Sequence, residues 1–169
     1  MEIVKKIDIH VHSDVWHEKY CPDSFKDKIK HHILPNDLRK KYDAMGIEKG
    51  VLLASIDEDN NIMEYANEYS AEVSKEYPDL FIWFCNLDPR IIETDPRTDI
   101  CALLEKYKQM GAKGVGELCP PIPADCATMD YFYSCCEECD LPIIIHMQPI
   151  AHALHYNAFL CIRDHPMQR

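Results

Sequence analysis

The sequence has little glycine, and its basic residues are outnumbered. Glycine occupies only five of 169 positions, while 47% of the residues are hydrophobic and 28% are charged. This composition excludes collagen-like, low-complexity and disordered chains, so one globular domain over 1–169 is expected. Eighteen basic residues stand against twenty-nine acidic ones, which gives a net charge of −11. Such a chain repels nucleic-acid phosphates and anionic membranes, and we expect neither as a partner.

Long apolar runs are also missing. The first residues, MEIVKKIDIH, lack the apolar stretch of a signal peptide. No later segment reaches the roughly 18 apolar residues that a membrane-spanning helix needs. Together these absences favour a cytoplasmic location.

Cysteine, in contrast, is frequent, with nine residues. An odd number without an export signal argues for free thiols in a reducing compartment rather than a disulfide framework. The cluster CCEEC at 135–139 lacks a second cysteine or histidine pair at zinc-finger spacing, so packing is expected for it. The patterns HExxH, GxGxxG and the P-loop are absent as well.

Apolar segments rich in β-branched and aromatic residues alternate with helical patterns along the chain. Strands are predicted at 4–11, 50–55, 80–87, 112–118 and 141–147, and helices at 36–46, 60–78, 97–111 and 128–140. Asn36 and Thr128 stand where helix caps are expected, and Gly46 and Gly111 stand where helices end. The alternation indicates an α/β fold with a parallel sheet covered by helices.

Histidines and one glutamate follow the predicted strand ends. His10 and His12 are two apart in one strand, so their side chains project to the same side and can reach one ion. Asp8 shares that side and could orient an imidazole or bind the ion itself. His146 ends the fifth strand and Glu117 ends the fourth, at the edge where α/β folds place their active sites. The alternatives are a structural histidine and a capping or ion-pairing carboxylate.

These segments resemble the amidohydrolase-related family, which includes metal-dependent hydrolases and decarboxylases of the aminocarboxymuconate-semialdehyde type. The matching motifs are IDIHVH, GAKGVGEL and LPIIIHMQP, and the resemblance covers about residues 3–150. It implies a (β/α)8 TIM-type barrel, here partial, with about five parallel strands and covering helices. It also implies that His10, His12 and His146 bind a divalent metal, most often zinc, with Glu117 as a possible fourth ligand. The implied reaction is hydrolysis of a small organic substrate by a metal-activated water, with decarboxylation as the alternative.

A complete barrel of this kind needs about 250 residues, and only positions 148–169 follow the fifth strand. We therefore expect a domain that is incomplete at its C-terminal end. Only Glu117 and Asp14 are then left as proton carriers, so weak or absent turnover is expected. Two sheet edges would lack partners, with Ile9, Leu53 and Ile145 facing a missing wall. This predicts self-association through the exposed edges, a rearranged open sheet, or poor solubility.

Two other interpretations stay open. Metal phosphoesterases of the polymerase-and-histidinol-phosphatase type also begin with a motif like IDIHVHS, but they usually carry Thr-Asp-His after the second strand, where this chain has LLASIDED. The second interpretation is a truncated relative that has no catalytic activity and acts through protein contacts.

Overall fold

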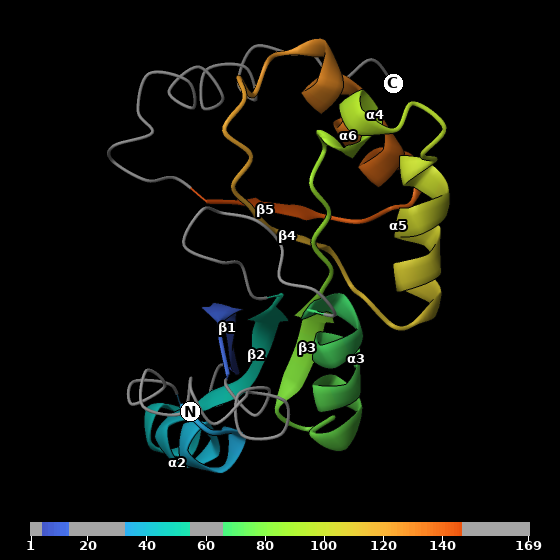
Figure 1. Cartoon of the computed structure of the whole chain (residues 1–169). Helices are drawn as coiled ribbons and strands as arrows, with labels where there is room; N and C mark the ends of the chain where they lie inside the picture. The colour runs from blue at the N-terminus through green and yellow to red at the C-terminus, as the bar shows by residue number, and fades with distance from the viewer. Residues whose placement is uncertain (1–4, 14–32, 55–65, 147–169) are drawn as a thin grey trace, which may run out of the picture.

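The computed structural model of the chain describes residues 5–13, 33–54 and 66–146. Ten helices and strands are found in these ranges, and helices separate consecutive strands (Figure 1). In chain order they are β1 (Lys6–Val11), α2 (Pro35–Met45), β2 (Ile47–Leu53), α3 (Ala66–Glu76), β3 (Phe81–Phe84), α4 (Ile91–Thr94), α5 (Ile100–Gln109), β4 (Val115–Leu118), α6 (Ala127–Glu138) and β5 (Ile143–Ile145). All five predicted strands and all four predicted helices are present. The short helix α4 was not predicted.

The strands are parallel and lie in sequence order. β1, β2 and β3 form one sheet, and β4 and β5 form a second. A parallel bridge between Cys85 and Val115 joins the two, supported by the backbone bonds from Cys85 N to Gly114 O at 3.0 Å and from Gly116 N to Cys85 O at 2.8 Å. Figure 1 shows β4 and β5 turned across the direction of the first three strands. This is the strand order and curvature of part of a (β/α)8 barrel.

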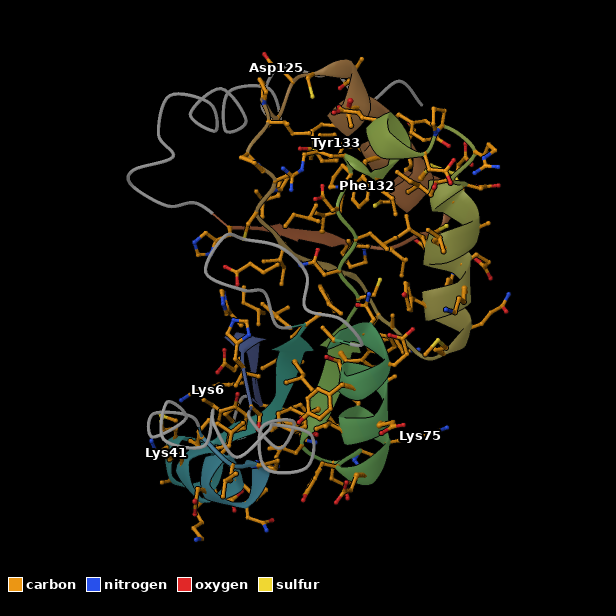
Figure 2. The ribbon with its side chains drawn as sticks, viewed as in Figure 1. Lys6, Lys41, Lys75, Asp125, Phe132 and Tyr133 are labelled. Carbon is orange, nitrogen blue, oxygen red and sulfur yellow. A yellow bond between two sulfur atoms is a disulfide. The ribbon has the colours of Figure 1, made fainter. Side chains whose placement is uncertain are left out.

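One apolar core runs across both sheets. It includes Tyr42 on α2, Leu52 on β2, Leu104 on α5 and Phe132 on α6, each at most 2% exposed. Figure 2 labels Phe132 and its neighbour Tyr133 on α6. Because the core spans the junction between β3 and β4, the described part of the chain packs as one unit.

The residues predicted to face a missing wall differ in their surroundings. Leu53 is 1% exposed because it packs in a small cluster with Val51 and Phe84. Ile9, in contrast, is 65% exposed and Ile7 is 56% exposed, on a strand that pairs only with β2 among the described residues. The prediction was therefore wrong for Leu53, whose neighbours lie within its own half of the barrel. Self-association through the β1 edge stays a prediction.

The helix ends follow the sequence in part. Gly46 ends α2 in the left-handed conformation, with φ of 68°, as predicted. The predicted caps were wrong: Asn36 lies inside α2, whose cap is Leu34, and Thr128 lies inside α6. Asp99 caps α5 instead, and its side chain accepts a hydrogen bond from the backbone N–H of Ala102 at 2.9 Å. None of the described helices has the length and apolar character needed to span a bilayer.

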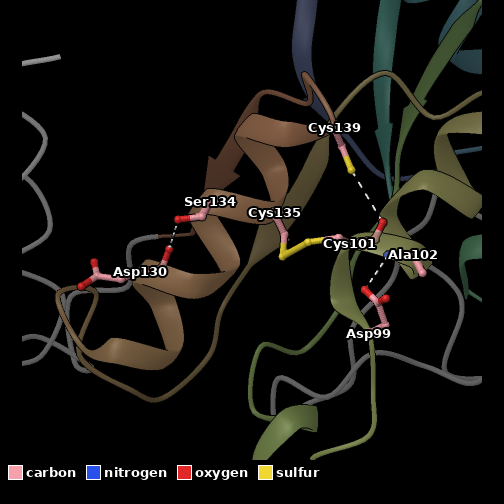
Figure 3. The surroundings of a disulfide bond; sticks show 7 residues. All are labelled: Asp99, Cys101, Ala102, Asp130, Ser134, Cys135 and Cys139. Atoms are coloured by element: carbon pink, nitrogen blue, oxygen red, sulfur yellow. Dashed lines mark hydrogen bonds between the residues drawn. A yellow bond between two sulfur atoms is a disulfide. The ribbon is translucent and has the colours of Figure 1, made fainter. Parts of the chain in front are cut away.

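One disulfide corrects the prediction that the cysteines are free thiols. Cys101 on α5 and Cys135 on α6 form a disulfide, with their Cα atoms 4.9 Å apart (Figure 3). The two helices pack side by side and bring these thiols within bonding range, which spacing along the chain does not reveal. Cys139, one helical turn after Cys135, donates to the carbonyl of Cys101 at 3.6 Å. The described free cysteines are Cys85, Cys119, Cys126, Cys136 and Cys139.

Candidate metal centre

The predicted site residues come together at the carboxyl ends of the strands. His10 lies near the end of β1 and His12 directly follows that strand. Glu117 lies in β4, and His146 directly follows β5. Parallel strands place these ends on the same edge of the sheet, so residues more than one hundred positions apart in sequence meet there.

Glu117 is the centre of this group. Its carboxylate Oε2 lies 3.2 Å from Nε2 of His10 and 3.4 Å from Nε2 of His12. Its other oxygen, Oε1, contacts Nδ1 of His146. The imidazoles of His10 and His12 also meet edge to face, with their Nε2 atoms 3.2 Å apart. One carboxylate therefore connects all three predicted histidines.

The donors form two sets that share Glu117. One ligand atom from each of His10, His12 and Glu117 lies within 4.8 Å of the others. The same limit holds for Glu117, Cys119 and His146. The structure thus joins His146 to the strand-1 pair through the carboxylate, whereas the sequence predicted a single cluster. Cys119 was not predicted, because nothing in its sequence context separates it from the buried cysteines.

Asp8 takes a different position from the one expected. Its Oδ2 accepts a hydrogen bond from the Tyr42 hydroxyl at 2.8 Å, and its Oδ1 accepts one from the backbone N–H of His10 at 3.1 Å. The register of β1 against β2 is irregular between Asp8 and Val11. Asp8 therefore fixes the strand before the histidines and anchors α2 to it.

Two buried asparagines position Glu117 from behind. Asn86 follows β3 and donates to the main-chain oxygen of Glu117 at 2.6 Å. Asn67 on α3 accepts from the backbone N–H of Asn86 and donates to its carbonyl, both at 2.7 Å. Both side chains are buried. Buried polar side chains in folded proteins are nearly always hydrogen-bonded, as these two are. This chain of bonds from α3 to β4 could not be read from the sequence, since the three residues are far apart in it.

The electrostatics of the site favour cation binding. Glu117 is only 3% exposed, and its carboxylate faces imidazoles rather than a lysine or arginine among the described residues. Burial lowers the pKa of His10, helped by the nearby His12 imidazole, and burial also lowers the pKa of His12. Both imidazoles are therefore neutral near pH 7, with nitrogen lone pairs available for a metal.

These pKa shifts predict how stability depends on pH. The folded metal-free chain binds protons at His10 and His12 less readily than the unfolded chain, where the ordinary histidine pKa is 6.5. The loss of folding stability that these two histidines cause is absent well above pH 6.5. It grows as the pH falls through that value and levels off below the lowered pKa values of the folded chain. We expect the double variant His10→Ala, His12→Ala to lose less stability than the unaltered chain between about pH 7.5 and about pH 5. Urea unfolding with a chelator at both pH values measures this, and equal losses would contradict the shifts.

Gly116 allows β4 to approach β5 beside the site. Its φ is 146°, and a Cβ added there would lie 2.7 Å from the main-chain oxygen of Ile144. We expect Gly116→Ala to destabilise the fold by about 1–3 kcal/mol through backbone strain, with a further cost from the clash, and to weaken metal binding by displacing Glu117. Gly46→Ala is the matched control, since Gly46 also has positive φ, of 68°, but open space around it. Similar metal affinities for the two variants would show that the close strand approach does not set the site.

Some predicted residues lie outside the described part of the chain. Asp14, the second predicted proton carrier, is one of them. Its role therefore stays a prediction.

Solved structures share this fold. An uncharacterised TIM-barrel protein from Bordetella bronchiseptica aligns with a TM-score of 0.58 and 18% identity over 94% of this chain and 61% of its own. A probable 2-pyrone-4,6-dicarboxylic acid hydrolase from Acinetobacter baumannii gives 0.56 and 15%, over 95% of this chain and 55% of its own. A 5-carboxyvanillate decarboxylase from Novosphingobium aromaticivorans, complexed with manganese, gives 0.55 and 16%, over 84% and 49%. The chain therefore shares the fold of part of these TIM-barrel proteins.

The chain spans about half the length of these solved structures. This confirms the predicted partial barrel. No family model and no curated protein matches the sequence. The similar structures include both a hydrolase and decarboxylases, so the fold by itself is compatible with either reaction.

Proposed function

We propose that this chain carries the metal centre of an amidohydrolase-type enzyme that hydrolyses a small organic substrate. The observation that supports this most strongly is the buried Glu117 carboxylate, held between the imidazoles of His10 and His12 on one side and His146 on the other. A buried carboxylate without a cationic partner is costly, and a divalent ion among these donors offsets that cost.

The donor set fits a divalent metal. Imidazole nitrogens and carboxylate oxygens suit zinc, manganese and iron, and the lowered pKa values of His10 and His12 reduce competition from protons. His10, His12 and Glu117 would hold the ion. His146 would contact the other oxygen of the Glu117 carboxylate. When bound, the ion supplies Lewis-acid polarisation and activation of water.

The chain's own residues would position the reaction and move protons. Asn86 and Asn67 hold the Glu117 backbone, so the carboxylate keeps its place without relaxing into solvent. Glu117 is within contact distance of all three imidazoles and can exchange a proton with them. The two roles compete, because Glu117 bound tightly to an ion is a weaker base.

The substrate we propose is a small ring compound that carries a carboxylate. One similar structure is a probable 2-pyrone-4,6-dicarboxylic acid hydrolase. Two others are a 2,6-dihydroxybenzoate decarboxylase and a 5-carboxyvanillate decarboxylase. A divalent ion would attract such an anion in spite of the negative charge of the chain.

Decarboxylation of the same class of substrate is the second candidate. It is favoured by the manganese found in the structures of the 5-carboxyvanillate and dihydroxybenzoic acid decarboxylases. Manganese is accordingly a candidate metal beside the zinc predicted from the sequence.

The test combines metal analysis with product detection. The purified chain should contain at least about one equivalent of zinc, manganese or iron. The double variant His10→Ala, His12→Ala should contain much less metal. Turnover of pyrone and hydroxybenzoate carboxylates, which is expected to be weak at most, should stop with a chelator and return with metal. Ring opening would indicate hydrolysis, and released carbon dioxide would indicate decarboxylation. Unaltered protein that binds no metal after exposure to all three ions would contradict the proposal and favour a chain that acts through protein contacts.

A further inference from the structure

A cavity lies at the opposite end of the strands from the proposed metal centre. Lys49 is near the start of β2, Phe81 begins β3 and Lys113 shortly precedes β4, so the cavity is at the amino ends of these strands. Ser74 and Lys75, in the last turn of α3, line it on the helix side. Its volume is about 310 Å³. The function proposed above makes no use of this cavity.

The inner wall of the cavity is apolar and aromatic. Phe81 and Trp83 of β3 belong to the buried core, and Met110, at the end of α5, is a partly exposed apolar residue. The indole nitrogen of Trp83 lies 3.6 Å from the position that a Cβ on Gly111 would take, so no side chain at Gly111 covers the indole on that side. Because a cavity of about 150 Å³ in a protein holds a benzene ring, this cavity has room for a single or fused ring.

Three lysines give the rim of the cavity a positive charge. Lys75 and Lys113 are exposed and Lys49 is half-buried, and within the described part of the chain none of the three forms an ion pair with a carboxylate. The Lys49 ammonium donates to the main-chain oxygen of Pro78 at 2.7 Å and keeps two further N–H groups. Since the chain has a net charge of −11, this cluster is a local reversal of charge that favours an anion.

The hydroxyl of Ser74 offers a further donor. Its oxygen is buried and has no hydrogen-bond partner among the residues that the structure describes. Ser70, one turn earlier on α3, shows the usual arrangement, because its hydroxyl donates to the carbonyl of Ala66 at 2.9 Å. Buried polar atoms nearly always find a partner. A ligand in the cavity that Ser74 lines would supply one.

We propose that this cavity binds a small ring-shaped anion, a one-ring or two-ring aromatic compound with a carboxylate or sulfonate group. The ring lies against Phe81, Trp83 and Met110, and the charged group lies among the ammonium groups of the three lysines. The described residues that line the cavity include no histidine, cysteine or carboxylate, so the site binds this ligand without the means to convert it. The site is separate from the metal centre and does not depend on the proposed function.

The indole N–H signal of Trp83 reports binding in the full chain. The chain has two tryptophans, and the variant Trp16→Phe identifies the Trp83 signal in a proton–nitrogen correlation NMR spectrum. Naphthalene-2-sulfonate is the probe, inorganic phosphate is the anion without a ring, and 2-naphthol is the ring without the charge. We expect the sulfonate to shift the Trp83 signal in a saturable titration, and the other two compounds to bind about 10-fold more weakly or less.

Two double variants separate the cavity from the overall charge. Lys75→Gln with Lys113→Gln removes two charges at the cavity and should weaken sulfonate binding by about 10-fold. Lys40→Gln with Lys41→Gln removes two charges on α2, outside the cavity, and should leave binding unchanged. Figure 2 labels Lys75 on α3 and Lys41 on α2. Circular dichroism confirms that each variant is folded, and the single variants replace a pair that is not.

The proposal is overturned if the sulfonate leaves the Trp83 signal in place, or if the two double variants bind it equally well. Equal binding would mean that the lysines only complement the C-terminal ends of α3 and α5. Phosphate or 2-naphthol that binds as well as the sulfonate would contradict the combination of ring and charge. Metal binding at Glu117 is measured separately, so the proposed function is unaffected by each of these results.

Discussion

Replacing Glu117 by glutamine is expected to weaken divalent-metal binding by about 100-fold or more, because it removes the negative charge that both donor sets share. Glutamine keeps the shape of the side chain and the backbone bond from Asn86, so the fold should persist. Isothermal titration of the metal-stripped chain with Mn²⁺ and Zn²⁺ measures the change.

Glu105→Gln is the matched control for this charge removal. Glu105 lies on α5 with its side chain in an exposed hydrogen bond to Gln109, and it belongs to neither donor set. Its variant should bind metal as the unaltered chain does. Equal affinities for the Glu117 and Glu105 variants would show that the buried carboxylate is a structural group and not a ligand.

The second large effect concerns stability. Phe132 on α6 is 0% exposed and belongs to the core that joins the two sheets. Phe132→Ala is expected to lower the free energy of unfolding by about 3–5 kcal/mol, since it loses buried apolar surface and leaves a cavity. Because whole domains are stable by only about 5–15 kcal/mol, this is a large part of the total.

Tyr131→Ala provides the comparison for Phe132. Tyr131 is the preceding residue on the same helix but is 42% exposed. Its loss should change stability by much less, about 0.5 kcal/mol for a surface site. Urea unfolding of both variants gives the difference, and similar costs would mean that α6 does not pack against the core as described.

The sequence predicted the fold well because its signal is local. Apolar segments such as 80–87 and 141–147 carry the pattern of buried parallel strands, and Gly46 ends its helix through a conformation that few other residues adopt. The caps were less predictable: Asn36 and Thr128 have suitable side chains, but the chain enters each helix before them. Side-chain type permits a cap, and the path of the backbone decides it.

The site was predictable only where spacing or strand position carried the information. His10 and His12 are two apart on one strand, and His146 and Glu117 stand at strand ends, so their residue types and positions indicated an edge site. Cys119 and Asn86 gave no such signal, because their importance lies in contacts across strands. The Cys101–Cys135 disulfide likewise depends on how α5 packs against α6.

The most direct test of the metal centre is a crystal structure of the metal-loaded chain, with anomalous diffraction recorded at the absorption edge of the bound ion. An anomalous peak is expected about 2.0–2.2 Å from the Glu117 carboxylate and from the Nε2 atoms of His10 and His12. A fully loaded crystal with its anomalous peaks far from Glu117 would contradict the account.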